Sequence, residues 1–323
     1  MFTVDTTIHE IAGKPEFKNR KYMTGAFTGI AGFASGFFKL KTMAKFSGWN
    51  AQDMADGMNH LYGQAQKGQV LHEIYTDEEK AADPSKKLTG LAALPVEKKS
   101  RFVLVIAGGG YGAVCSMVEA YPVIKAINEA GYAAFSLHYR VGKAALHPNP
   151  VDDVAAAIRY ILKNADALNV DGSDYAVMGF SAGGHLAAMF GTEQEGYAKY
   201  GLPKPGAAIL CYPVITMGEK THPGSAKRFL GDKAADPAEQ DKYSADKLVT
   251  AAYPPAFVWQ FDADSLVPVD NSRMMAEALK DNGIPCEYVT YPGTLHGAGI
   301  GTGTACEGWL DKALAFWKKQ SHF

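Results

Sequence analysis

The sequence predicts an α/β protein, in which helices cover both faces of a mostly parallel central sheet. From Arg101 onward, short apolar runs rich in β-branched residues alternate with segments of helical periodicity. Strands that alternate with helices in this way form parallel sheets. The chain has 323 residues, of which 47% are hydrophobic and 20% charged, so it is long enough to bury a substantial core and ordinary in composition.

Each expected strand is a short apolar run, and the expected helices lie between these runs. Residues 102–107 are apolar without interruption and precede three glycines, which is typical of a strand buried on both faces. Residues 151–162 carry apolar side chains at helical spacing, with Asp152 and Asp153 at the positive end of the helix dipole. We expect strands at residues 70–75, 102–107, 132–139, 175–179, 207–212, 256–261 and 287–291, and helices at 122–130, 151–162, 185–190, 271–281 and 309–317.

Residues 1–90 differ from the rest of the chain because strand signals are sparse there. We therefore divide the chain into an N-terminal extension, residues 1–90, and an α/β domain, residues 91–323; the extension is interpreted as a cap, a lid or a contact in a homo-oligomer. Residues 77–87 are polar, charged and broken by Pro84, which predicts a surface loop. Residues 22–38 are uncharged, but 17 residues rich in small side chains are short for a membrane span, so we expect a lid or packing arm and no membrane partner.

Charge and cysteine content exclude several classes of function. The formal net charge is −2 and the basic residues are scattered, so no nucleic-acid surface is expected and the partner is interpreted as a small, near-neutral molecule. The cysteines form no CxxC pair, which argues against a disulfide framework or a zinc site and favours a reducing compartment. The first residues lack a basic segment followed by an apolar one, so we expect a cytoplasmic protein without a signal peptide. The four cysteines are Cys115, Cys211, Cys286 and Cys306.

Ser181 lies in the run Gly-Phe-Ser-Ala-Gly at residues 179–183, after an expected strand and before an expected helix. A serine hydroxyl becomes a useful nucleophile when it projects from a tight, strained turn between strand and helix, where flanking side chains would clash. The amide that follows the serine, here that of Ala182, can then point at a developing oxyanion. A glycine-rich turn without function is the alternative, and the strand–turn–helix setting disfavours it.

A serine nucleophile of this kind needs a histidine base, which comes late in the chain in the order serine, acid, histidine. His296 lies in a glycine-flanked loop directly after the last expected strand. His222 follows no strand, His322 is at the terminus, and His185 is better explained as a packing residue of the helix after Ser181. His296 is therefore the candidate base.

An acid and an oxyanion hole complete the requirements. The loop after residues 256–261 offers two acids, Asp262 and Asp264, and the pattern alone leaves both open. The glycine-rich run 107–112 follows an earlier strand, where side-chain-free residues allow the backbone to approach a substrate carbonyl. A phosphate-binding loop is the rival interpretation, but the run has no GxGxxG spacing.

Residues 102–317 resemble the α/β-hydrolase esterases of the acetyl-esterase, acetylxylan-esterase-like and hormone-sensitive-lipase-like groups. In these relatives the triad acid is followed by two residues and then Val-Pro, which selects Asp264, and their nucleophile and base match Ser181 and His296. The motifs that carry the resemblance are AGGGYG at 107–112, GY at 131–132 with HYRV at 138–141, PVDDV at 150–154, GFSAGGHLAA at 179–188, CYPV at 211–214, DSLVP at 264–268 and LHG at 295–297.

The resemblance implies a serine carboxylesterase that hydrolyses short-acyl, above all acetyl, esters through an acyl-enzyme, without a metal or organic cofactor. Many relatives have a loop-ordering histidine where this chain has Ala107; we expect Gly108 and Gly109, closely followed by Gly110, to form the oxyanion hole with Ala182. Residues 213–249 are expected to form a wall of the acyl pocket. A peptidase or amidase of the same fold, and a binding protein without activity, are the alternatives.

Overall fold

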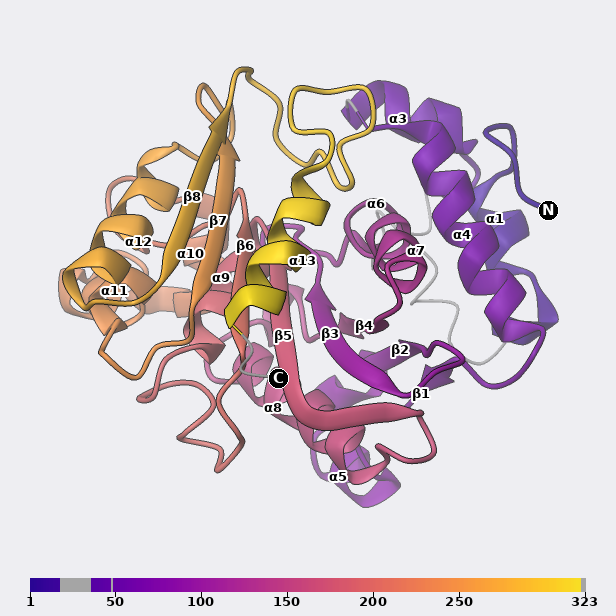
Figure 1. Ribbon diagram of the computed structural model, residues 1–323, viewed down its shortest axis with the longest axis horizontal. Coiled ribbons are helices and arrows are strands. Elements are labelled where there is room, and N and C mark those ends of the chain that lie inside the picture. Colours follow the sequence, from indigo (N-terminus) through magenta and orange to yellow (C-terminus); the bar gives the residue numbers. More distant parts are fainter. Residues whose placement is uncertain (18–35, 48, 321–323) are drawn as a thin grey trace.

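An eight-stranded sheet forms the centre of the molecule, with the strand order β1-β2-β4-β3-β5-β6-β7-β8 (Figure 1). The structure is a computed structural model and describes residues 1–17, 36–47 and 49–320. Strands β3 to β8 run parallel to one another, whereas β1 and β2 join the edge in antiparallel fashion. The prediction of a mostly parallel sheet is thus confirmed. The strands are β1 Leu71–His72, β2 Gly90–Leu94, β3 Ser100–Ile106, β4 Ala133–His138, β5 Val170–Phe180, β6 Ala207–Cys211, β7 Ala256–Phe261 and β8 Cys286–Tyr291.

The parallel strands lie where the apolar runs predicted them, within a few residues except at β5. Strand β5 begins at Val170, five residues before its expected start. Its first half is polar, and there only Val170 pairs with β3, so this part carries no apolar run that could predict a strand. Strand β1 has only two of the six expected residues. The sequence analysis missed β2, whose five residues are all buried and pair with β4.

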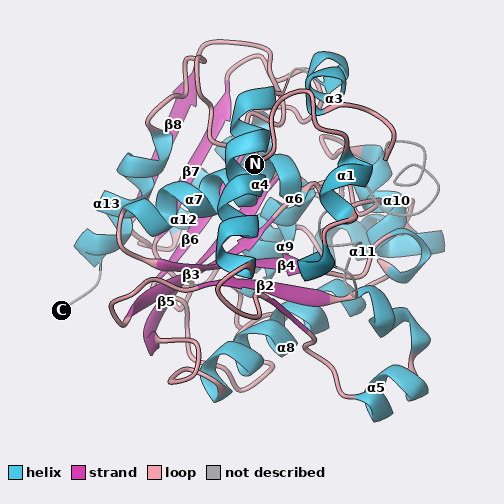
Figure 2. Cartoon of the chain, turned by 90° about the vertical axis from the view of Figure 1, so that its right-hand side faces the viewer, coloured by secondary structure: helices cyan, strands magenta, loops and turns pink. Residues whose placement is uncertain are grey.

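Helices cover both faces of this sheet, and each expected helix is present. Figure 2 shows α7 on one side of the sheet, behind α4 in this view, and α8 on the opposite side. Helix α9 packs on β5 and β6, α12 on β7 and β8, and α13 on β6 and β7. These helices are α7 Tyr121–Glu129, α8 Asn149–Lys163, α9 Ala182–Phe190, α12 Asp270–Asp281 and α13 Trp309–Gln320.

The N-terminal extension packs on the α/β domain through its helices. Helix α4 (Ala51–Ala65) lies against α7, and a Cβ added at Gly57 would be 2.5 Å from the backbone nitrogen of Pro122, so a side chain there would push the helices apart. Apolar residues of α1 (Ile8–Ala12), α3 (Leu40–Ser47) and α4 belong to the same buried cluster as the sheet. The predicted division between residues 90 and 91 falls inside β2. A role of the extension as cap, lid or subunit contact stays a prediction.

The prediction of a surface loop at residues 77–87 is wrong in conformation. Residues Asp77–Ala82 form α5, and a 3-10 helix, Pro84–Leu88, follows it. Thr76 and Glu79 start α5 as a capping box, because each side chain accepts a hydrogen bond from the other residue's backbone N–H. No residue of α5 is buried, so the segment does lie at the surface.

The uncharged segment 22–38, expected to be a lid or packing arm, lies mostly outside the described residues. Within residues 1–17, 36–47 and 49–320, no helix is both long and apolar enough to cross a membrane.

Helices α6 (Ser116–Glu119), α10 (Pro223–Leu230) and α11 (Pro237–Lys242) complete the connections between strands. Helix α6 follows the glycine-rich loop after β3, and α10 and α11 lie in the long connection between β6 and β7. Both connections leave the sheet at the carboxyl ends of their strands, the edge at which open α/β sheets bind ligands.

Candidate active site

Ser181 stands at the sharp turn between β5 and α9, with a backbone φ of +53° and ψ of −120°. A non-glycine residue with this φ is rare, and such strain is found mostly at functional sites. The glycines on either side permit the turn, because an added Cβ at Gly179 would lie 2.1 Å from the carbonyl oxygen of Gly183, and one at Gly183 would lie 2.1 Å from that of Ile106. The sequence run at 179–183 therefore folds into the strained strand–turn–helix that its pattern predicts.

The structure brings Ser181, His296 and Asp264 together, although they come from three different loops. His296, in the loop after β8, has its Nε2 2.8 Å from the Ser181 Oγ and its Nδ1 2.8 Å from the Asp264 Oδ2. Because an ionised carboxylate only accepts hydrogen bonds, Nδ1 carries the ring proton and Nε2 is left to accept the serine proton. This is the geometry that a serine nucleophile and its base require.

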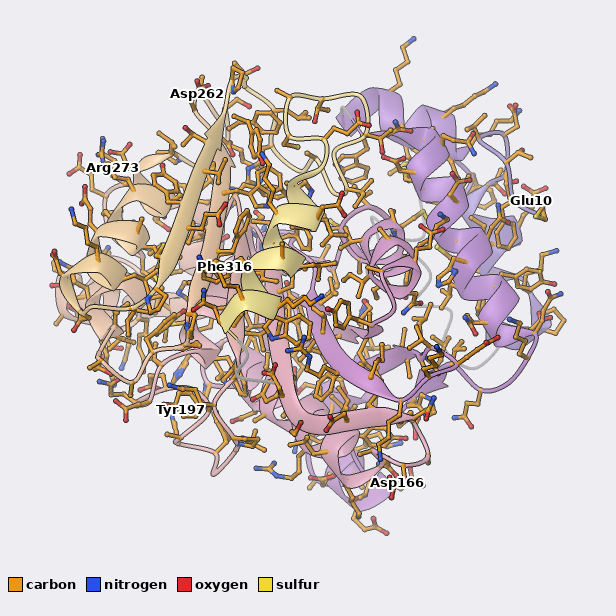
Figure 3. The ribbon with its side chains drawn as sticks, viewed as in Figure 1. Glu10, Asp166, Tyr197, Asp262, Arg273 and Phe316 are labelled. Atoms are coloured by element: carbon orange, nitrogen blue, oxygen red, sulfur yellow. The ribbon has the colours of Figure 1, made fainter. Side chains whose placement is uncertain are left out.

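Asp264 and Asp262 have different surroundings, which separates the two acids that the sequence pattern left open. The Asp264 side chain is completely buried, and its Oδ1 accepts hydrogen bonds from the amides of Leu266 and Val267, at 2.9 and 3.0 Å. Asp262 is exposed at the outer edge of the molecule, where its Oδ1 accepts a hydrogen bond from the amide of Gly293 (Figure 3). Asp264 alone is in contact with His296.

The glycine-rich loop after β3 differs from the expectation at one residue. The Gly108 amide, expected to be an oxyanion donor, donates to Oε2 of Glu119 at 2.6 Å, so it is already used. Within the described ranges, the amides of Gly109, Gly110 and Ala182 have no hydrogen-bond acceptor, and both Gly109 and Gly110 line the same pocket as Ser181. The candidate donors are therefore Gly109, Gly110 and Ala182.

A pocket of about 750 Å³ opens over Ser181, a volume suited to a small-molecule ligand. Its apolar residues come from both ends of the chain and include Trp49 of the N-terminal extension, Leu266 and Leu295. Its polar wall contains His222 and Arg228, which come from the expected wall segment 213–249. The sequence analysis did not select Trp49, His222 or Arg228, because their approach to the pocket depends on tertiary packing.

His222 lines this pocket, and its hydrogen bonds show which ring nitrogen carries the proton. Its Nδ1 is 3.3 Å from the backbone nitrogen of Ser225, which can only donate, so Nδ1 accepts and Nε2 carries the ring proton. Arg228 donates through one guanidinium nitrogen to the carbonyl oxygens of Gly110 and Gly224, both at 3.0 Å. Among the described residues Arg228 has no acidic partner, so the pocket edge offers donors and positive charge to a ligand.

His185, which the sequence analysis interpreted as a packing residue, is used inside the fold. Its Nε2 donates to the carbonyl oxygen of Tyr243 and its Nδ1 accepts from the Tyr111 hydroxyl, both at 2.8 Å. Burial lowers the pKa of His185 to about 4, so the ring is neutral at pH 7. Its role is to hold the glycine-rich loop, through Tyr111, against α9.

No metal centre accompanies the site within the described part of the chain. Among residues 1–17, 36–47 and 49–320, no three or more His, Cys, Asp or Glu side chains are grouped so that they could hold a metal ion. The four cysteines are unpaired by disulfide bonds.

The strand order, with a serine at the turn after β5 and a histidine loop after β8, defines the α/β-hydrolase class. A family model described as BD-FAE matches residues 93–279, more than half of the chain, and the chain belongs to this family.

Known relatives agree with this assignment. The chain is 37% identical over 216 residues to endo-1,4-beta-xylanase B of Butyrivibrio fibrisolvens. The match covers 64% of this chain and 34% of the xylanase. It is 33% identical to an acetylxylan esterase of Xylanibacter ruminicola, covering 70% of this chain and 47% of the relative. The chain thus spans half or less of the length of these two relatives.

A solved structure is similar over most of its own length. The acetyl ester-xyloside bifunctional hydrolase of Caldicellulosiruptor lactoaceticus superposes with a TM-score of 0.66 at 32% sequence identity. The match covers 76% of this chain and 96% of that chain. The shared part therefore corresponds to nearly the whole of the solved relative.

Proposed function

We propose that this chain is a serine carboxylesterase that removes short acyl groups, above all acetyl, from a saccharide. The observation that carries the proposal is the hydrogen-bonded chain from Ser181 through His296 to Asp264, beside backbone amides that have no acceptor among the described residues. A nucleophile, a base, an orienting acid and an oxyanion hole are the four parts that acyl transfer requires.

In the proposed mechanism, the Ser181 Oγ attacks the ester carbonyl while His296 Nε2 takes the hydroxyl proton. Asp264 keeps the ring in the orientation that leaves Nε2 free and stabilises the positive charge that forms. The amides of Gly109 or Gly110 and of Ala182 donate to the oxyanion. His296 then protonates the leaving alkoxide, and a water molecule, deprotonated by the same imidazole, releases the acid from Ser181.

Two observations support a saccharide as the alcohol half of the ester. Three similar proteins are named endo-1,4-beta-xylanase B, acetylxylan esterase and acetyl ester-xyloside bifunctional hydrolase. The pocket edge offers hydrogen-bond donors from His222 and Arg228, which suit hydroxyl oxygens, and Trp49 adds an aromatic ring to the lining of the same pocket.

The test compares turnover of p-nitrophenyl acetate, butyrate and octanoate, followed by acetate release from acetylated xylooligosaccharides. We expect kcat/KM to fall as the acyl chain lengthens, and Ser181→Ala to lower kcat by about 10⁴-fold or more. Wild-type turnover that survives in Ser181→Ala would contradict the assigned nucleophile.

The saccharide part is tested separately with His222→Phe. This change removes the Nε2–H donor, so we expect a higher KM for acetylated xylooligosaccharides and an unchanged KM for p-nitrophenyl acetate, which has no hydroxyl groups to bind. Equal changes in KM for both substrates, or no change for either, would contradict the saccharide assignment. The proposed mechanism at Ser181 would still stand.

A further inference from the structure

A buried carboxyl group, that of Glu119, is among the residues that line the pocket and takes no part in the mechanism above. Glu119 is the last residue of α6, and only 4% of its surface is exposed. Both of its oxygens have partners: Oε2 accepts the Gly108 amide at 2.6 Å, and Oε1 is 3.0 Å from the Tyr212 hydroxyl. The carboxyl therefore reaches the oxyanion loop on one side and the residue after β6 on the other.

Tyr212 continues this chain of contacts to the loop that carries His296. Its hydroxyl accepts a hydrogen bond from the Gly299 amide at 3.1 Å, and its ring packs edge-on against His296, with centroids 5.0 Å apart. Tyr212 adopts a φ of +38°, which is rare for a residue with a side chain, and its amide donates to Trp259 at 2.6 Å. A strained residue held at both ends indicates that its position is required.

The hydrogen bonds assign the donors along this path. The Gly108 amide can only donate, so Oε2 accepts. The Tyr212 hydroxyl already accepts from Gly299, which leaves its own proton for Oε1 of Glu119. Both carboxyl oxygens thus act as acceptors, the arrangement that suits an ionised carboxylate.

Few charged groups surround Glu119 among the described residues. The pKa of Glu119 lies above its ordinary value because burial outweighs the Gly108 amide, a positive charge on His296 and the Tyr212 hydroxyl, which act to lower it. The other titratable groups that face it are Cys115, Tyr139, Cys211 and Tyr212; burial raises the pKa of each of these, so they stay neutral. Unlike these four groups, His296 gains a positive charge during the proposed reaction.

We propose that Glu119 is a positioning residue that couples the oxyanion loop to the histidine loop through Tyr212. By holding the Gly108 amide, Glu119 fixes the loop so that the amides of Gly109 and Gly110 face the pocket before substrate arrives. In its ionised form, which the two hydrogen-bond donors favour, Glu119 also stabilises the imidazolium ring of His296. The inference rests on the proposed function, because both effects act on the acyl-transfer step.

The resemblance to the esterase groups gives this role a physical reason. Many of those relatives order the oxyanion loop with a histidine at the position of Ala107, which has no polar side chain. In this chain, Glu119 reaches the same loop from α6 and supplies the hydrogen bond to its backbone. Preorganised donors stabilise the transition state because they need no rearrangement during the reaction.

Three variants separate the two effects of Glu119. Glu119→Ala removes both the loop contact and the charge, and we expect kcat for p-nitrophenyl acetate to fall about 100-fold, the scale of losing one oxyanion donor, with KM changed less than about twofold. Glu119→Gln keeps an acceptor for Gly108, so it restores part of kcat but moves the acid limb of the kcat/KM profile to lower pH. Tyr212→Phe keeps the charge and breaks the link, so it lowers kcat without moving that limb.

A double variant tests the coupling itself. If Glu119 and Tyr212 act as one unit, Glu119→Ala with Tyr212→Phe lowers kcat by about as much as Glu119→Ala alone. Independent roles would multiply the two losses, and that result would overturn the coupling.

Tyr253→Phe serves as the matched control, because Tyr253 is a fully buried tyrosine whose hydroxyl donates to Ala188 away from the pocket. We expect it to lower the Tm and leave kcat unchanged. If folded Glu119→Ala and Tyr212→Phe behave like this control, or if none of the Glu119 and Tyr212 variants folds, the role of Glu119 is structural and the proposal is overturned.

The same comparison is made with the rate of covalent labelling by a fluorophosphonate, which needs no ester turnover. A wild-type protein without ester turnover contradicts the proposed function but still allows the Glu119 variants to be ranked by labelling rate. A wild-type protein that turns over ester at the same rate as Glu119→Ala contradicts the present inference alone.

Discussion

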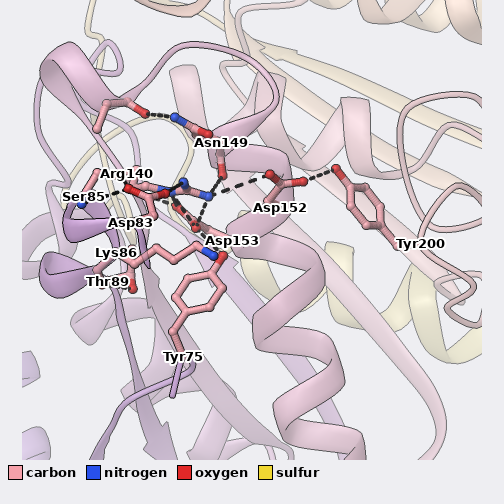
Figure 4. Close-up of polar contacts among 11 residues, drawn as sticks. Tyr75, Asp83, Ser85, Lys86, Thr89, Arg140, Asn149, Asp152, Asp153 and Tyr200 are labelled. Atoms are coloured by element: carbon pink, nitrogen blue, oxygen red, sulfur yellow. Dashed lines mark hydrogen bonds and ion pairs between the residues drawn. The ribbon is translucent and has the colours of Figure 1, made fainter. Parts of the chain in front are cut away.

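Two buried polar clusters of this molecule look alike at first, and only one of them has the features of an active site. The first contains Ser181, His296 and Asp264. The second, the arginine cluster, contains Arg140, Asp153, Tyr75 and Asp83 (Figure 4). Each has a carboxylate with a completely buried side chain, and each lies beside a hollow, of about 750 and about 590 Å³ respectively.

The difference lies in what each cluster leaves unused. In the arginine cluster, Asp153 accepts hydrogen bonds from the Tyr75 hydroxyl and from the backbone and guanidinium of Arg140, and Arg140 also donates to Asp83 and Asn149. The Arg140 guanidinium is thus hydrogen-bonded to both carboxylates of the cluster. The site instead combines a strained Ser181 with neighbouring amides that lack acceptors within the described residues.

Buried charge beside a hollow is therefore a poor marker of function. A polar group that is fully paired contributes to the fold, whereas a strained nucleophile next to unused donors is prepared to bind something else.

The acid of the site should matter far more than its exposed neighbour. We expect Asp264→Asn to lower kcat by about 10⁴-fold, because the His296 ring loses the partner that fixes its tautomer. Asp262→Asn, the matched change two residues away, should stay within a few-fold of wild type. Steady-state kinetics with p-nitrophenyl acetate measure both, and equal losses would contradict the separate roles of the two acids.

The arginine cluster should affect stability and not chemistry. Asp153→Ala leaves the Arg140 guanidinium buried without its main partner, so we expect the free energy of unfolding to fall by about 3–5 kcal/mol. Urea denaturation measures this loss. The kcat of the folded fraction should stay within about twofold of wild type, and a large fall in kcat without loss of stability would reverse the contrast.

Acid should destabilise the fold through two buried histidines. Burial lowers the pKa of both His138 and His185 to about 4, whereas an unfolded histidine titrates near 6.5. Between these values the unfolded chain binds protons that the folded chain does not, so this stability is complete above pH 6.5 and is lost as the pH falls toward 4.

Each histidine contributes up to about 1.4 kcal/mol per pH unit across that window. The free energy of unfolding, measured by urea denaturation between pH 7 and 4.5, should therefore depend less steeply on pH in His185→Gln, which lacks one of the two histidines. An unchanged slope in this variant would show that His185 does not carry the effect.

The smallest predicted effect concerns the contribution of the N-terminal extension to the pocket. Trp49→Ala removes apolar surface from the pocket wall, and we expect KM to rise a few-fold while kcat changes little. Tyr288→Ala, at an exposed aromatic residue outside the pocket, is the control and should leave KM unchanged. A KM equal to wild type in Trp49→Ala would mean that the extension does not contact substrate.

Much of the fold could be predicted because its signals are local. A run of apolar residues such as β7 can be buried on both faces only as a central strand, and the glycines around Ser181 are needed by a turn that closes within five residues. The same reasoning misread α5, because it weighed the polar composition and Pro84 and overlooked the Thr-x-x-Glu spacing at residues 76–79, which is the pattern of a capping box.

The details of the site depended on contacts between distant segments. The Gly108 amide was expected to face the substrate, but it is held by Glu119, eleven positions later in the chain. Three residues that line the pocket come to it only through tertiary packing, which leaves no periodic pattern in the sequence; they are Trp49, His222 and Arg228. Asp264 could be chosen over Asp262 from the family resemblance, and the structure adds the physical difference, since only Asp264 is buried and touches His296.

The most direct test of the account is to locate the covalent bond that its nucleophile should form. Wild-type protein, Ser181→Ala and His296→Ala are treated with a fluorophosphonate and examined by intact mass and peptide mapping. We predict one adduct per chain, on Ser181, with none in Ser181→Ala and labelling slowed by orders of magnitude in His296→Ala. A folded wild-type protein that remains unlabelled, or a full adduct on another residue, would contradict the account.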